Sequence, residues 1–287
     1  MNLYSIHTGN FKLDGGAMFG VVPKTIWNKL NPADSNNLCS WAMRSLLIED
    51  GNRLILIDTG IGDKQDAKFM GHYHLHGNES LDSSLAAHGF NRNDITDVLL
   101  THLHFDHCGG AIRRAGEGFE SAFPNANFWS NEKHWQWAVT PNDREKASFL
   151  KENILPIQQS GQLHWIKRSE TSTNNALDLT EWLPQISMRF VDGHTESMML
   201  PQITYKGHQI VYMADLLPSI AHIPLPYVMA YDMFPLTTLG EKKSFLQEAL
   251  NNNYILFFEH DPVIECCRLV STEKGIRAGD TFKLSEI

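Results

Sequence analysis

The chain has 287 residues, of which 42% are hydrophobic and 20% are charged, as in ordinary globular proteins. Its net charge of −9 argues against nucleic acid or an anionic membrane surface as the main partner, because both attract basic proteins. The N-terminus lacks the basic and apolar regions of a signal peptide, and no apolar run reaches the length of a membrane span. The four cysteines show no disulfide spacing, so we expect a reducing, cytoplasmic location.

Apolar and amphipathic patterns alternate along the whole chain. An Asp-Gly turn between two apolar runs predicts a β-hairpin over residues 45–57, which ends at Asp58. The remaining patterns predict helices over 79–90, 131–151 and 237–251, strands over 98–100, 186–191, 210–213 and 254–258, and a surface loop over 169–175. Because strands and helices recur to the end, we expect one mixed α/β domain over residues 1–287, with helices packed outside sheets.

The segment THLHFDHCGG, residues 101–110, follows the apolar run 98–100 directly. Side chains alternate along a strand, so His102 and His104 would share one side, and a helix starting next would present Asp106 and His107 from its first turn. Burying four polar groups so close together is unfavourable without a partner. The segment therefore predicts two pairs of ligands for two adjacent metal ions, with a solvated His-rich turn as the alternative.

Three further candidate ligands each follow a predicted strand: His194, Asp215 and His260. Strand ends converge on one rim of a sheet, where a rigid scaffold holds functional groups in place. Imidazole and carboxylate ligands suit Zn²⁺ and also Mn²⁺, Fe²⁺ or Co²⁺. Five histidines and two aspartates exceed the needs of one tetrahedral ion, so we expect two divalent ions.

This ordered set resembles the metallo-β-lactamase-fold hydrolases, which share an HxHxDH motif followed by isolated His, Asp and His ligands. The match covers about residues 40–262. The resemblance implies an α/β fold, a four-layer αβ/βα sandwich with the metals at one edge. It assigns one ion to His102, His104 and His194, the other to Asp106, His107 and His260, and a bridging position to Asp215. Asp58 would orient a ligand histidine from behind the metal site.

Within that superfamily, the chain is most similar to the N-acyl-homoserine lactonase and methyl-parathion-hydrolase-like branch. The likeness is carried by the loop Gly20–Lys24, the segment Phe123–Ala126 and the second-site ligand His260. Pro218 departs from the pattern, because several lactonases carry a tyrosine three residues after the bridging aspartate. Thr195 and Glu196 also follow His194, where many relatives have Pro-Gly. Both departures bear on which substrate the site would accept, and neither affects the expected metal ligands.

The resemblance implies a quorum-quenching type of lactonase, or another esterase. A hydroxide bridging the two ions would attack the carbonyl of a small lactone, such as an N-acyl-homoserine lactone, or of another ester, with phosphotriester hydrolysis as a side activity. Asp106 is the expected proton shuttle, and Asp215 the second catalytic carboxylate. The alternatives are a glyoxalase-like thioesterase or a β-lactamase on the same scaffold, and then a non-catalytic metal-binding module.

Substrate choice is expected to come from loops over the metal rim. Met18, Phe19 and Trp27 would form an apolar wall, or else be ordinary half-buried loop residues. The segment 220–227, with His222, would either line the pocket or bury the surface of a homodimer.

Several other residues resemble metal ligands without fitting the motif. His72, His74 and His76 alternate along a short segment that lacks nearby carboxylates, so we expect a surface or rim loop. His134 is expected to serve helix packing, and Cys108 to be a small buried residue.

Overall fold

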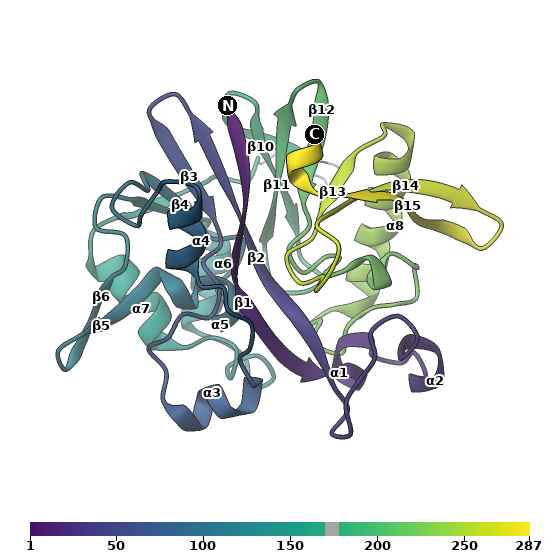
Figure 1. Ribbon diagram of the computed structural model, residues 1–287, viewed down its shortest axis with the longest axis horizontal. Coiled ribbons are helices and arrows are strands. Elements are labelled where there is room, and N and C mark those ends of the chain that lie inside the picture. Colours follow the sequence, from purple (N-terminus) through teal and green to yellow (C-terminus); the bar gives the residue numbers. More distant parts are fainter. Residues whose placement is uncertain (170–177) are drawn as a thin grey trace. The chain divides into compact units, whose positions relative to one another are not determined.

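The computed structural model describes residues 1–169 and 178–287, so the loop predicted over 169–175 lies, beyond Ser169, outside the described residues. The chain divides into two compact units (Figure 1). Unit 1 comprises Met1–Asn10 and Met43–Lys167, and unit 2 comprises Phe11–Ala42 and Arg168–Ile287. The expected mixed α/β class is confirmed, whereas the single domain over 1–287 stays a prediction.

The sheet of unit 1 has the strand order β1-β2-β3-β4-β7-β8. Its strands are β1 (Asn2–Asp14), β2 (Leu38–Asp50), β3 (Arg53–Ile57), β4 (Asp97–Leu99), β7 (Asn127–Ser130) and β8 (Leu163–Trp165). β1 passes from unit 1 into unit 2 after Asn10, and β2 passes from unit 2 into unit 1 at Met43. β2 and β3 form the predicted hairpin, in which Gly51 takes the left-handed φ of +60° that the turn requires.

β3, β4, β7 and β8 pair in parallel, so their carboxyl ends meet at one edge of the sheet. Asp58 and the segment 101–107 follow β3 and β4 and therefore lie at this edge. β4 is anchored by Asp97, which accepts hydrogen bonds from Arg53, Thr96 and Trp129 at 2.7–3.1 Å. The strand that leads into the histidine motif is thus fixed at its first residue.

Unit 1 also contains helices and a small hairpin. They are α3 (Ala67–Tyr73), α4 (Leu81–Ala87), α5 (Phe105–Cys108), η1 (Gly109–Ala111), β5 (Ile112–Ala115), β6 (Gly118–Ser121), α6 (Glu132–Val139) and α7 (Lys151–Gln159). The core between them contains Leu56, Val98, Phe128, Trp135 and Ile154. Asp106 and His107 lie in α5, as predicted.

The helix predicted over 131–151 is wrong in length. α6 ends at Val139, and α7 begins separately at Lys151. The cause is Pro141, which has no N–H to donate and disfavours helical backbone at the residue before it.

The sheet of unit 2 has the order β15-β14-β13-β12-β11-β10-β9. Its strands are β9 (Leu179–Leu183), β10 (Ile186–Val191), β11 (Met198–Tyr205), β12 (His208–Tyr212), β13 (Ile255–Phe257), β14 (Cys266–Thr272) and β15 (Gly275–Phe282). β10 runs antiparallel to β11, β11 runs antiparallel to β12, and β12 runs parallel to β13. β10, β12 and β13 therefore end at the same edge, and each end is followed by one predicted ligand.

Helix α8 (Pro235–Asn251) connects β12 to β13 and packs against β14 and β15 (Figure 1). The predictions of β10, β12, β13 and α8 are confirmed. Unit 2 also contains α1 (Gly15–Phe19), α2 (Lys24–Trp27), η2 (Ile220–His222) and η3 (Leu284–Glu286). None of the helices in the described part of the chain is long and apolar enough to cross a membrane.

Candidate metal centre

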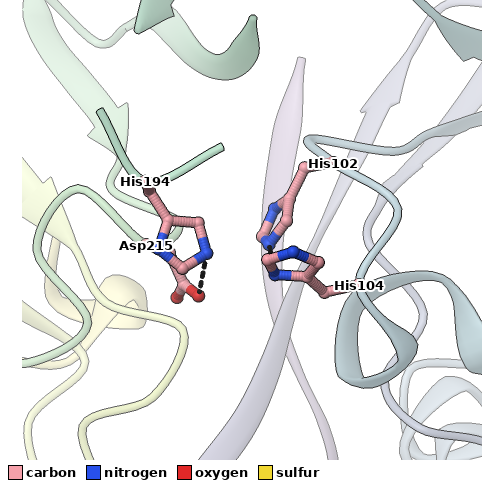
Figure 2. Close-up of side chains that lie close together, drawn as sticks. All are labelled: His102, His104, His194 and Asp215. Atoms are coloured by element: carbon pink, nitrogen blue, oxygen red, sulfur yellow. Dashed lines mark hydrogen bonds and ion pairs between the residues drawn. The ribbon is translucent and has the colours of Figure 1, made fainter. Parts of the chain in front are cut away.

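His102 and His104 form the first pair of predicted ligands in unit 1. Nε2 of His102 lies 3.1 Å from Nδ1 of His104, and a dashed line joins these rings in Figure 2. Thr101 donates its hydroxyl proton to Asp58 at 2.6 Å, so its oxygen accepts from Nδ1 of His102 at 3.1 Å. The outer nitrogen of His102 therefore carries the proton, and the lone pair on Nε2 faces His104.

Glu145 holds the opposite ring nitrogen in His104, Nε2 instead of Nδ1. Its Oε1 lies 2.9 Å from Nε2 of His104, and its Oε2 accepts from Trp137 at 2.6 Å. Because a carboxylate only accepts, the proton of His104 belongs on Nε2 and the lone pair on Nδ1. Glu145 was not predicted from the sequence, because its neighbours Asp143, Arg144 and Lys146 resemble a solvated charged turn.

Asp58 lies behind the motif, where the resemblance placed it. It follows β3 with a φ of +58° and accepts from the backbone N–H of Thr101 at 2.8 Å. Its Oδ2 lies 3.2 Å from Nδ1 of His107, which leaves Nε2 of His107 on the side of Asp106, 3.8 Å from Oδ2. Asp58 thus orients His107 and, through Thr101, also His102.

The predicted ligands of unit 2 gather around Asp215. Nε2 of His194 lies 3.1 Å from Oδ2 of Asp215, and Nε2 of His260 lies 3.2 Å from Oδ1 (the His194 pair is dashed in Figure 2). Nδ1 of His194 contacts Asp232 at 2.8 Å, and Nδ1 of His260 contacts the carbonyl oxygen of Ala42 at 2.7 Å. Asp232 was also missed, since no motif marks it.

The charges around His194 favour a cation. Burial alone lowers its pKa, but the carboxylates of Asp215 and Asp232 outweigh burial and raise the pKa to about 10. Surroundings that stabilise a protonated imidazole also stabilise a metal ion at the same nitrogen.

All five predicted histidine ligands share one arrangement. In each ring, one nitrogen is held by an oxygen and the other nitrogen is directed at another predicted ligand. Facing lone pairs, as in His102 and His104, repel each other unless a cation or a proton lies between them. Outer oxygen partners of this kind are typical of metal-binding histidines. The donor set therefore fits divalent ions.

Close backbone packing fixes the loop that leads to His194. A Cβ atom on Gly193 would lie 2.3 Å from the backbone nitrogen of Thr238 in α8, so only glycine fits here. Pro218 contributes through its backbone, because its carbonyl accepts the N–H of His260 at 3.1 Å. Pro218, which departs from the pattern of several lactonases, thus supports the loop that carries His260.

The four predicted pocket residues lie close together in unit 2, where the rings of three of them form a buried stack. The rings of Trp27 and Phe19 are parallel with centroids 5.3 Å apart, and Phe19 stacks on His222 at 4.7 Å. Because a carbonyl oxygen only accepts, Nε2 of His222 donates a hydrogen bond to the carbonyl oxygen of Met18 at 2.9 Å. All four side chains are buried. Their contact with substrate stays a prediction.

The other candidates behave as expected. His72, His74 and His76 are exposed around the end of α3, and the potential metal-binding groups found in the described residues do not include them. His134 in α6 is buried and its Nε2 accepts the N–H of Leu103, so it packs behind the motif. Cys108 is buried, which raises its pKa to about 12.

Comparisons with known proteins concern the fold of the chain and the family that residues 44–138 match. Residues 44–138 match the model of the metallo-beta-lactamase superfamily. A probable metal-dependent hydrolase from Staphylococcus aureus is 28% identical, with a TM-score of 0.86 over 98% of this chain and 96% of that chain. The dizinc quorum-quenching lactonase AidC, in complex with the product N-hexanoyl-L-homoserine, is 20% identical, with a TM-score of 0.78 over 98% and 95% of the two chains.

An N-acyl homoserine lactone hydrolase, with N-hexanoyl-L-homoserine at its catalytic metal centre, is 20% identical, with a TM-score of 0.67 over 91% of this chain and 93% of that chain. A search of curated protein sequences found no match. Residues 44–138 therefore match a metallo-β-lactamase superfamily domain, and the mixed α/β structure of the chain has the metallo-β-lactamase fold.

Proposed function

We propose that this chain is a metal-dependent hydrolase in which the ligand sets of both units serve one dinuclear centre. The observation that carries the proposal is the shared arrangement of the five histidines, each held from outside by an oxygen. One ion is assigned to His102, His104 and His194, and the other to Asp106, His107 and His260, with Asp215 shared. Zn²⁺ is the proposed metal, because imidazole and carboxylate donors suit it.

The proposed substrate is a small lactone of the N-acyl-homoserine type, or another ester. Structural relatives that act on such lactones support this choice, as does the net charge of −9, which disfavours a large anionic substrate. Phosphotriester hydrolysis is proposed as a side activity of the same centre, and quorum quenching as the biological role of a lactonase of this kind.

When bound, the two ions would supply an activated water and a Lewis acid for the carbonyl oxygen. Asp106 takes a proton from the attacking water and returns it to the leaving oxygen as the ester C–O bond breaks, which gives a carboxylic acid and an alcohol. Asp58, Glu145 and Asp232 keep the protons of their histidines on the outer nitrogens. The inner lone pairs then remain available as ligands.

The test combines metal analysis with a substrate panel. The purified protein should contain two equivalents of divalent metal, hydrolyse an N-acyl-homoserine lactone or an aryl ester, and lose activity with dipicolinate. His104→Ala and Asp215→Ala should lose both metal and activity, whereas Asp280→Ala, on an exposed residue of β15, should lose neither. Turnover of only a glutathione thioester or a β-lactam would overturn the substrate class. Full activity without metal would overturn the proposal itself.

A further inference from the structure

Two neighbouring residues of α8, the acidic Glu241 and the basic Lys242, are both buried, with 7% and 1% of their surface exposed. Buried charges are costly unless hydrogen bonds replace the lost water. Successive residues of a helix point about 100° apart, so these two side chains reach different neighbours. Their partners therefore show what each charge does.

Glu241 binds the loop that leads into His194. Its Oε1 accepts the N–H of Asp192 at 2.7 Å, and its Oε2 accepts the N–H of Gly193 at 3.1 Å. The carbonyl oxygens of Gly193 and His194 accept N–H groups from Phe234 and Met233 at 2.8 and 3.0 Å. The backbone on both sides of the ligand's attachment point is thus held by α8 and the residues just before it.

Lys242 binds a different segment, residues 222–227, which begins at the last residue of η2. Its Nζ donates to the carbonyl oxygens of His222 and Tyr227 at 2.7 Å each, and lies 3.3 Å from those of Pro224 and Leu225. An ammonium group has three protons, so four carbonyl oxygens satisfy it fully. Lys242 therefore acts as an internal cation around which this short segment is wrapped.

The two sets of partners do not overlap. The hydrogen bonds of the Glu241 carboxylate go to the His194 loop, and those of the Lys242 ammonium go to the segment that carries His222 and its stack on Phe19. We propose that Glu241 and Lys242 are positioning residues with separate tasks: Glu241 fixes the metal ligand His194, and Lys242 fixes the segment 222–227 as a determinant of substrate specificity. The second task rests on the proposed function.

The first experiment compares Glu241→Gln with Lys242→Met in the full-length protein. Glu241→Gln should weaken Zn²⁺ binding about tenfold, as loss of an outer partner does, while KM changes less than about twofold. Lys242→Met should keep Zn²⁺ affinity within about twofold and raise KM about tenfold, because the carbonyl oxygens of segment 222–227 lose the ammonium group that holds them. Lys243→Met and Glu273→Gln, on exposed residues, are the matched controls and should change neither quantity.

The second experiment needs no catalysis. Lys242→Ala removes three carbons and the ammonium, so n-propylammonium replaces the missing atoms. Millimolar n-propylammonium should raise the melting temperature of Lys242→Ala and leave that of Lys242→Met and the wild type unchanged. It should also restore the KM of Lys242→Ala.

The outcomes separate the two proposals. If both variants weaken Zn²⁺ binding and raise KM alike, or if n-propylammonium fails to stabilise Lys242→Ala selectively, the division of tasks is overturned. If the wild type hydrolyses no lactone or ester, the proposed function fails. Zn²⁺ titration of Glu241→Gln and the n-propylammonium shift would then still decide whether these residues position their two segments.

Discussion

Replacing Asp232 should weaken metal binding in a graded way. Its Oδ1 lies 2.8 Å from Nδ1 of His194, and only 1% of its side chain is exposed. A hydrogen bond to a charged group contributes about 1.5–3 kcal/mol, and about 1.4 kcal/mol corresponds to a factor of ten in affinity. Asp232→Asn keeps an oxygen acceptor but loses the charge, so we expect about a tenfold loss of Zn²⁺ affinity. Asp232→Ala loses both, so we expect about a hundredfold loss.

The assay is competition for Zn²⁺ against a chromophoric chelator, with circular dichroism to verify that each variant is folded. Asp280→Ala, on an exposed residue of the same unit, is the control and should bind like the wild type. Wild-type affinity in a folded Asp232→Ala protein would refute the reasoning, because His194 would then need no outer partner.

Three further changes test packing and pH dependence. Burial alone would raise the pKa of Asp97, but the hydrogen-bond donors around it outweigh burial and hold the pKa below the usual 3.8. The stabilisation that the Asp97 carboxylate gives the folded protein is therefore complete above about pH 4 and is lost as the pH falls through the lowered pKa. The difference in unfolding free energy between the wild type and Asp97→Asn, from urea titrations, should accordingly narrow below pH 4. Gly193→Ala places a Cβ against the backbone of Thr238 and should destabilise the protein by about 1–3 kcal/mol and weaken Zn²⁺ binding. Trp27→Ala removes the end of the buried stack and should cost about 3–5 kcal/mol in urea unfolding.

Each of these has a result that contradicts it. A constant Asp97→Asn difference from pH 7 to pH 3 would mean that the carboxylate is not preferentially ionised in the folded state. Unchanged Zn²⁺ affinity in Gly193→Ala would mean that the His194 loop has room to move. A cost below about 1 kcal/mol for Trp27→Ala would mean that the stack is not tightly packed.

The strand ends could be predicted from the sequence because burial leaves a clear pattern. β10, β12 and β13 are apolar runs, and a polar residue that could bind metal follows each of them. β1 was not predicted, since its side chains are mostly half-buried and Gly9 interrupts it. The helix prediction over 131–151 failed because the amphipathic spacing continues past Pro141, whereas the proline ends the helix.

Asp58 could be predicted because it ends a strand, but Glu145 and Asp232 could not, because they come from distant positions without a pattern. Glu145 lies 41 residues after His104, and Asp232 lies 38 residues after His194. Only the fold brings these carboxylates to the histidines. A cytoplasmic location, a homodimer and the contact of Met18, Phe19, Trp27 and His222 with substrate stay predictions.

The stack of Trp27, Phe19 and His222 also sets the order in which the chain can fold during synthesis. Residues 11–42 leave the ribosome early, but their partners in unit 2 lie beyond residue 168. At typical rates of translation, the intervening residues 43–167 take about 6–25 s to appear. Unit 1 can therefore close first, while Trp27 and Phe19 remain exposed. The early segment of the nascent protein thus waits for its packing partners until unit 2 has been synthesised.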